Sequence, residues 1–181
     1  MAGADAVRGQ RLMAALDAAA IHARLRTGFG DAIGDLAGAR RDNMYATVVP
    51  AKIAQVCRFM KAERGLEFDC LSNLGGVDYP KRNVIEVVYH LYSYPHRHLF
   101  TLKVGAARDN PVVPTVSGVW SHADWQEREV FDLLGVVFEG HPDLRRILMP
   151  EDWPGHPLRK DFVEPEEYHG ISTSRESLLK A

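Results

Sequence analysis

Residues 84–104 read VIEVVYHLYSYPHRHLFTLKV, and this stretch decides the fold. β-Branched and aromatic side chains dominate residues 84–92, which predicts a strand. Its alternating pattern places four side chains on one face: Ile85, Val87, Tyr89 and Leu91. A proline-containing segment then favours a chain reversal, and residues 99–104 alternate again, with Thr101 and Lys103 expected to face water. The stretch therefore predicts two antiparallel strands with one buried and one solvated face.

The residues upstream predict two more strands and a helix between them. Residues 45–49 are expected to form a short strand, and residues 66–70 a half-buried one, because apolar and acidic residues alternate there. Pro50 fits the first position of the intervening helix and Gly65 its C-cap. The core-facing stripe of this helix is Ile53, Val56, Cys57 and Met60. The glycines at 75–76 are expected to mark a turn or a bulge.

A charged helix is predicted over residues 122–134. Ser121 is expected to cap it, with Asp124 three residues on as in a capping box, and Gly135 is expected to end it. Two aromatic residues have the spacing of a hydrophobic staple across this helix start: Trp120 and Trp125. An alanine-rich segment from about Gly9 to Arg26 predicts a further helix at the N-terminus, followed by a glycine-containing linker.

The chain changes character after Phe138. Five prolines there forbid long helices and central strands, at positions 142, 150, 154, 157 and 165. A disordered tail would avoid the apolar residues that this segment also contains, so we expect an extended arm that buries them against a partner. The predicted fold is α+β, a mainly antiparallel sheet with helices packed on one face, plus an extended C-terminal arm. Its parts are an N-terminal helix and linker (1–42), a core domain (43–138) and a docking arm (139–181).

Composition excludes several classes of function. The 181 residues are 46% hydrophobic and 25% charged with a net charge of -2, so there is no basic face for nucleic acid. No apolar run approaches the roughly 20 residues that span a bilayer, so membrane contact is expected only through partners. The two cysteines, Cys57 and Cys70, are expected to be reduced core residues. The sequence shows no nucleophile elbow, phosphate loop or dinucleotide fingerprint, and hence no catalytic constellation.

Two charge patterns admit both a plain and a functional interpretation. Arg128 and Asp132 lie one helical turn apart and could form a surface ion pair, or could engage a partner across an interface. Glu127 and Glu129 point to different faces and therefore do not form an acid–base dyad. Two histidine pairs could suggest a metalloenzyme, but neither has further ligands at the usual spacing: His96 with His98, and His141 with His156.

Several segments together resemble one known family. Residues 127–135 read EREVFDLLG, residues 141–148 read HPDLRRIL and residues 155–162 read GHPLRKDF. With GVDYP at 76–80 and EVVYHLYS at 86–93, they closely resemble the C-type, or 30 kDa-type, subunit of respiratory NADH:quinone oxidoreductase (complex I). The similarity covers roughly residues 45–163. It departs from the family pattern at Val163, where many members have proline.

The resemblance implies a non-catalytic structural subunit in the peripheral arm of a proton-translocating enzyme that transfers electrons from NADH to quinone. It implies no cofactor in this chain, with FMN, iron–sulfur clusters and quinone held by other subunits. The implied partners are the quinone-site (D-type) subunit and the terminal iron–sulfur cluster (B-type) subunit, at the cytoplasmic face of the bacterial inner membrane. The alternatives are the equivalent subunit of a membrane-bound hydrogenase or plastoquinone-linked relative, and a free-standing binding module.

The resemblance also implies which residues meet the partner subunits. These are Glu127, Arg128, Glu129, Asp132, His141, Pro142, Asp143, Arg145, Arg146, Leu148, His156, Pro157, Leu158, Arg159, Lys160, Asp161 and Phe162. Arginine matches carboxylates in a bidentate way, so the basic pairs within this set suit an interface with acidic groups. A solvated loop is the plain alternative for the same charges.

Overall fold

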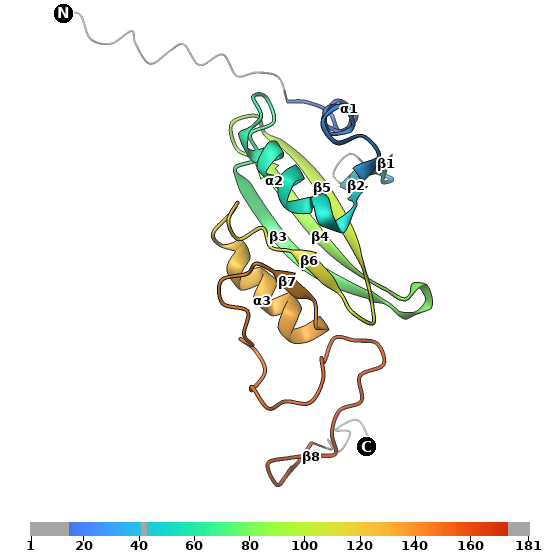
Figure 1. The fold of residues 1–181 in the computed structure, drawn as a ribbon, viewed down its shortest axis with the longest axis vertical. Helices are drawn as coiled ribbons and strands as arrows, with labels where there is room; N and C mark the ends of the chain where they lie inside the picture. Colours follow the sequence, from blue (N-terminus) through green and yellow to red (C-terminus); the bar gives the residue numbers. More distant parts are fainter. Residues whose placement is uncertain (1–14, 41–42, 174–181) are drawn as a thin grey trace, which may run out of the picture.

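A central β-sheet organises the molecule, whose computed structural model describes residues 15–40 and 43–173. Its strands are Ile33–Ala37 (β1), Tyr45–Val48 (β2), Cys70–Tyr79 (β3), Val84–Ser93 (β4) and His98–Ala107 (β5). They lie in the order β1-β2-β5-β4-β3 (Figure 1). β2 and β5 run parallel, whereas the other neighbouring strands run antiparallel. The predicted α+β fold with a mainly antiparallel sheet is confirmed.

Strands β4 and β5 form the predicted pair in one continuous antiparallel register. All four core residues predicted for β4 are buried, which confirms the assignment of its inner face. The outer face differs at Thr101, which is only 4% exposed although water was expected there. His90 on β4 covers it, with Nδ1 at 3.1 Å from the Thr101 hydroxyl oxygen, and β2 lies on the other side. Neighbouring strands on both sides therefore shield a polar side chain that alternation alone assigns to solvent.

Helix α2 (Ile53–Ala62) covers the inner face of the sheet through the predicted stripe of apolar residues. A short 3-10 turn that begins at Pro50 leads into the helix. The helix ends at Glu63, whose amide bonds to the Phe59 carbonyl, so Gly65 lies in the turn beyond rather than at the cap. Two free cysteines belong to this region: Cys57 is buried as predicted, whereas Cys70 is only half-buried.

Within the described residues, the N-terminal helix begins later than predicted and ends three residues beyond Arg26. Helix α1 spans Ala18–Phe29, and the Asp17 carboxylate caps it by accepting a hydrogen bond from the Ala20 amide at 2.8 Å. The predicted start near Gly9 lies outside the described residues. The linker predicted after the helix is wrong at residues 33–37, because β2 supplies the hydrogen-bonding partner that makes them edge strand β1.

Two predictions about the strand that precedes β4 are wrong. The strand begins at Cys70, and residues 66–69 lie outside it, because Glu67 has a φ of +41°, which interrupts extended backbone. The glycines at 75 and 76 mark no turn, since both lie inside β3 and pair with β4. Gly76 instead allows close packing, because a Cβ there would collide with the end of the Leu134 side chain.

Helix α3 (Ala123–Leu134) packs against β3, as Figure 1 shows. Gly135 ends it in the left-handed conformation, with a φ of +76°, as predicted. The predicted N-terminal cap is wrong, because His122 holds the cap position without a side-chain hydrogen bond. The Asp124 amide bonds to the Ser121 carbonyl, so a backbone turn replaces the expected capping box.

Short strands and irregular backbone make up the remainder of the described chain. Val112–Pro114 (β6), for which the sequence predicted no strand, pairs in parallel with Val137–Glu139 (β7). We call residues 140–173 the arm; it is irregular apart from the hairpin of Glu167–Tyr168 (β8) and Ile171–Ser172 (β9). It lies at the foot of the molecule beyond α3 in Figure 1. Among the described helices, none is both long and apolar enough to cross a membrane.

The contact between β3 and α3 predicts the effect of a single methyl group. We expect Gly76→Ala to lower the free energy of unfolding by roughly 1–3 kcal/mol, because the new Cβ must displace Leu134 and meets Val130 Cγ1 at 3.2 Å. Gly75→Ala is the matched control, since the nearest atom to its Cβ is Asn73 Nδ2 at 3.7 Å. Urea denaturation of both variants checks the prediction, and equal stabilities would contradict it.

Candidate functional site

The side-chain carboxylate of Asp132, on α3, binds backbone amides of the arm. Its side chain is fully buried, and Oδ2 accepts hydrogen bonds from three successive amides at 3.1, 2.8 and 2.9 Å: Ile147, Leu148 and Met149. Oδ1 accepts a fourth from Arg146 Nη1 at 3.0 Å. Burial alone would raise the pKa of Asp132, but the three amides and Arg146 outweigh it and hold the pKa below its ordinary value. The anchor is therefore a buried carboxylate that stays ionised.

Arg128 binds the same part of the arm from the next turn of α3. Its Nε donates to the Arg145 carbonyl at 3.1 Å and its Nη2 to the Arg146 carbonyl at 3.5 Å. Arg128 and Asp132 do not form the surface ion pair that was one of their two interpretations, because each side chain binds the arm instead. Trp125 does not act as a staple, since it is 63% exposed and its ring lies 5.0 Å from the Arg128 guanidinium carbon.

A second contact joins the arm to the C-terminal end of α3. The last carbonyls of a helix have no partner within the helix. Here the His156 ring bonds to the Asp132 carbonyl through Nδ1 at 2.9 Å, and the Leu158 amide donates to the Leu133 carbonyl at 3.0 Å. Arg159 Nε donates to the Leu134 carbonyl at 2.8 Å. The segment at 156–159 therefore completes the helix end, which explains its two basic side chains and their position.

A third contact joins the arm to the sheet through Asp78, at the end of β3. Arg108 donates to both carboxylate oxygens, at 2.8 and 3.1 Å, and the Lys160 amide donates to Oδ2 at 2.8 Å. Arg108 also pairs with Asp161 in the arm. The Arg108 hydrogen bonds hold the pKa of Asp78 below its ordinary value. This contact fixes the arm to strands that lie far away in the sequence.

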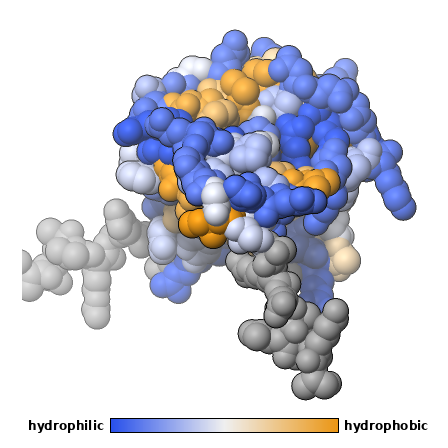
Figure 2. All heavy atoms as spheres, turned by 90° about the horizontal axis from the view of Figure 1, so that it is seen from below, coloured by the Kyte–Doolittle hydropathy of each residue, from blue (hydrophilic) through white to orange (hydrophobic). Residues whose placement is uncertain are grey.

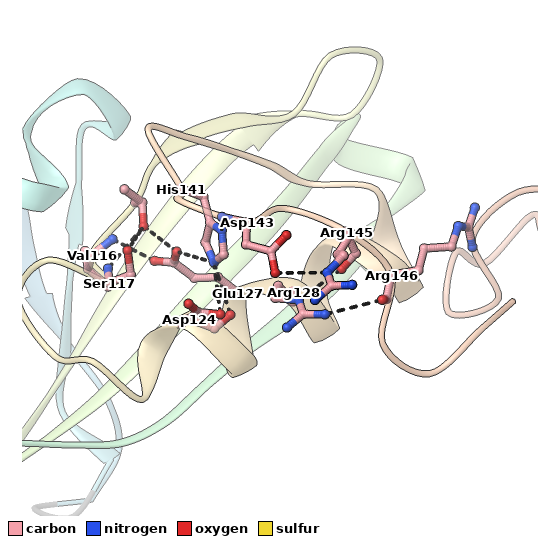
Figure 3. A network of polar contacts seen from close by, with 10 residues as sticks. Val116, Ser117, Asp124, Glu127, Arg128, His141, Asp143, Arg145 and Arg146 are labelled. Carbon is pink, nitrogen blue, oxygen red and sulfur yellow. Dashed lines mark hydrogen bonds and ion pairs between the residues drawn. The ribbon is translucent and has the colours of Figure 1, made fainter. Parts of the chain in front are cut away.

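Glu127 is enclosed where the arm begins (Figure 3). Its side chain is fully buried and accepts hydrogen bonds from the Val116 amide at 2.6 Å and the Thr115 hydroxyl at 2.5 Å. Its Oε2 lies 3.8 Å from Nε2 of His141, whose side chain is also buried. Burial raises the pKa of Glu127 to about 7, against the lowering effect of its two hydrogen bonds. The carboxyl thus links α3, the loop after β6 and the start of the arm.

The structure divides the predicted interface residues into three groups. Those buried within the chain are Glu127, Arg128 and Asp132. Those half-buried as whole residues, between the arm and α3 or within the arm, are His141 (whose side chain is buried), Arg146, His156, Pro157, Arg159 and Phe162. Those exposed are Glu129, Pro142, Asp143, Arg145, Leu148, Leu158, Lys160 and Asp161. Direct contact with a partner stays a prediction for all of them, and the exposed group is the one that the folded chain presents.

Sequence reasoning missed three residues that complete these contacts. Asp78 belongs to a quoted segment, GVDYP, but was given no role. Arg108 and Thr115 lie between the predicted strands and the predicted charged helix, and neither was given a role. Asp78 and Arg108 lie 30 residues apart and belong to no recognisable motif, so the sequence could not predict that they pair.

The histidine pairs have partners that account for them without a metal. His96 contacts the Glu67 carboxylate, and His98 Nε2 lies 2.8 Å from the Leu66 carbonyl. His141 and His156 contact different carbonyls of α3. Across residues 15–40 and 43–173 there is no group of three or more histidine, cysteine or acidic side chains placed to hold a metal ion.

The chain is similar to known proteins over most of its length. Residues 46–168 match the family described as respiratory-chain NADH dehydrogenase, 30 Kd subunit. The C subunit of NADH-quinone oxidoreductase from Roseiflexus sp. (strain RS-1) is 50% identical over 148 residues, which cover 81% of this chain and 84% of that protein. The C subunit from Roseiflexus castenholzii is 48% identical with the same coverage.

Two solved structures share the fold. One is a chain of the membrane-bound sulfane sulfur reductase, an archaeal respiratory membrane complex, with a TM-score of 0.67 and 27% identity. That match covers 80% of this chain and 85% of the other. The second is a trypsin-resistant fragment of Nqo5, with a TM-score of 0.58 and 28% identity, covering 70% of this chain and 98% of the fragment.

The Asp132 anchor predicts a local release of the arm. Asp132→Asn replaces the carboxylate, which accepts hydrogen bonds from three backbone N–H groups and Arg146, with a neutral amide. We expect the free energy of detaching the arm from α3 to fall by about 1–3 kcal/mol. Hydrogen exchange at the amides of residues 147–149 should then accelerate roughly tenfold or more, measured by mass spectrometry. Glu129→Gln removes the same charge from the exposed side of α3 and should leave these amides protected. Unchanged exchange in Asp132→Asn would rule out the anchor.

Proposed function

The chain belongs to the family of the 30 kDa subunit of respiratory-chain NADH dehydrogenase, and on that premise we propose that it is a non-catalytic structural subunit of the peripheral arm of a proton-translocating NADH:quinone oxidoreductase. The resemblance noted in the sequence is thereby confirmed. Electrons would pass from NADH to quinone through other subunits, which hold FMN, the iron–sulfur clusters and quinone. This chain would keep those subunits in place.

One observation carries the proposal: the arm is held by its backbone while its apolar side chains face outwards. The amides of Leu148 and Leu158 bond to α3, yet their side chains are 59% and 54% exposed. Val163 is 84% exposed. Figure 2 views the arm end of the molecule and shows hydrophobic patches within a hydrophilic surface. Burying one such side chain fully is worth roughly 1.5–3 kcal/mol, so a partner that covers the arm gains from each.

Charges around these apolar residues suit a protein partner. Arg145 and Lys160 are exposed beside Leu148 and Leu158, and Glu129 is exposed on α3. An apolar centre with a charged rim is the usual composition of a specific interface. We assign this surface to the quinone-site (D-type) subunit and to the B-type subunit, which holds the terminal iron–sulfur cluster. Attachment to the cytoplasmic face of the bacterial inner membrane would then be indirect, through these partners.

The buried charges have a different role in this proposal. Asp132, Arg128 and Arg146 contact the arm inside the chain, so they position it rather than meet the partner through their side chains. Apart from the ion pair between Asp132 and Arg146, the arm groups that Asp132 and Arg128 bind belong to the backbone, so most of these contacts do not depend on the arm's side chains. A preformed arm loses less conformational entropy on assembly than a free one does.

A second candidate within the same class is the equivalent subunit of a membrane-bound hydrogenase or plastoquinone-linked relative. This candidate is supported by the similarity to a chain of the sulfane sulfur reductase complex. That similarity shows that the same fold occurs in a respiratory complex other than NADH-quinone oxidoreductase. The relatives near 50% identity favour the NADH-linked complex. Flavin subunits that oxidise NADH, found by mass spectrometry in the purified native complex, would decide for the first; their absence would favour the second.

The exposed arm predicts a defect in assembly without a defect in folding. We expect the double variant Leu148→Ser with Leu158→Ser to keep the unfolding midpoint of the isolated chain, because both side chains already face water. Incorporation into the complex should fall at least about tenfold, since the lost apolar burial is worth more than about 1.4 kcal/mol. Native gel electrophoresis of membranes from cells that carry only the variant measures this.

Val49→Ser is the matched control for that experiment. Val49 is 49% exposed just after β2 and lies outside the arm, so its loss should leave assembly intact. Normal assembly of the double variant, or an equal defect in the control, would refute the docking role of the arm.

A further inference from the structure

Glu127 is a buried carboxyl surrounded by neutral donors. The Val116 amide and the Thr115 hydroxyl bond to its two oxygens, and neither donor carries a charge. A carboxylate that burial removes from bulk water without a cationic partner has a high free energy, and such groups take up a proton instead. This distinguishes Glu127 from Asp132, whose carboxylate has three amides and an arginine.

The hydrogen bonds of His141 place its ring proton towards Glu127. Nδ1 accepts a hydrogen bond from the Asp143 amide at 3.0 Å, so it carries no hydrogen. Nε2 therefore carries the hydrogen and lies 3.2 Å from the Asp124 carbonyl, 3.7 Å from the Asp124 carboxylate and 3.8 Å from Glu127 Oε2. Figure 3 shows His141 directed at Glu127 and Asp124. The ring thus offers Glu127 an N–H dipole.

Two hydroxyl groups connect the Glu127 carboxyl to solvent. Thr115 Oγ1 lies 2.9 Å from Ser117 Oγ, and both residues line a surface pocket of about 520 Å³. A hydroxyl can donate and accept at once, so the chain of bonds works in both protonation states. With a protonated carboxyl, Glu127 donates to Thr115 and Thr115 to Ser117; with an ionised carboxyl, Thr115 donates to Glu127.

The other titratable groups near Glu127 do not hold it ionised. Cys57 on α2 and Tyr89 on β4 approach from the core, and burial raises the pKa of both, so they are neutral at physiological pH. Asp124 on α3 is negative and opposes a second charge. Arg58 on α2 lines the pocket but is exposed to solvent, where its charge is screened.

We propose that Glu127 is a reversible proton-binding site whose charge controls how firmly His141, and with it the first turn of the arm, is held. The ionised carboxylate attracts the His141 N–H group; the protonated carboxyl does not, although its bonds to Thr115 and Val116 persist. Burial raises the pKa of Glu127 to about 7, so both forms are populated near neutral pH. The ligand of this site is the proton, and it reaches the carboxyl by way of Thr115 and Ser117.

Stability depends on the same proton. An unfolded glutamate ionises near a pKa of about 4.3, whereas the folded chain holds this proton up to about pH 7. Between these values the folded state binds more protons than the unfolded state, so this group's contribution to stability falls as the pH rises and is constant above pH 7. Glu127→Gln resembles the protonated form and does not titrate. The thermal unfolding midpoint of this variant, relative to that of the wild type, should therefore be higher at pH 8 than at pH 5.

The experiment is an NMR titration of the full chain labelled with ¹³C at its glutamate carboxyls. The Glu127 signal, identified by its loss in Glu127→Gln, should titrate with a midpoint near 7. The ring nitrogens of His141 should shift with the same midpoint, and that step should vanish in Glu127→Gln. A Glu127 midpoint near 4, or a His141 step that persists in Glu127→Gln, would overturn the proposal.

Two hydroxyl variants test the connection to the pocket. Thr115→Val removes a hydrogen bond from both forms of the carboxyl and should raise the Glu127 midpoint further, because the bond to the ionised form is the stronger of the two. Ser121→Ala removes a hydroxyl from the same pocket and should leave the midpoint unchanged. Equal midpoints in the two variants count against the connection. None of these measurements needs another protein of the complex, so they are independent of the assembly result.

Discussion

One buried carboxylate, that of Asp132, joins a domain with its own core to an arm that has none. The apolar core consists of residues from the sheet, the helices and the loops between them, and of the arm only Leu144 packs against its edge. What the arm lacks in apolar burial it gains from hydrogen bonds between its backbone and fixed groups on α3. Three consecutive amides can converge on one oxygen only where the chain turns tightly, so Asp132 determines the local shape of the arm as well as its position. Without that anion, three amides and a guanidinium would remain together without an acceptor, which is costly.

The parts of the fold that follow a local period were predictable from sequence, and the parts that depend on distant partners were not. The inner face of β4 and the stripe of α2 were predicted correctly because alternation and helical spacing report burial directly. β1 was missed because it is a strand only through its pairing with β2, and β6 because it is one only through β7. The division of the chain at residues 42/43 and 138/139 stays a prediction.

The charged helix shows the same limit in another form. Its acidic and basic residues suggested contact with another subunit, which stays a prediction. Within the chain, its own arm covers three of these residues, through contacts 14 to 18 residues further on that spacing within the helix could not reveal. Sequence therefore identified Glu127, Arg128 and Asp132 as unusual, but it could not separate residues that position the arm from those that another protein would touch.

The ties of Asp78 to Arg108 and Lys160 have a consequence for biosynthesis. Lys160 leaves the ribosome long after β3, and Asp78, Arg108 and the residues of α3 that bind the arm are all made before it. The arm can therefore take its final path only after the sheet has closed and α3 is in place. A nascent or misfolded chain lacks the finished outer surface, so a binding protein that recognises this surface selects completed molecules and leaves immature ones to proteolysis.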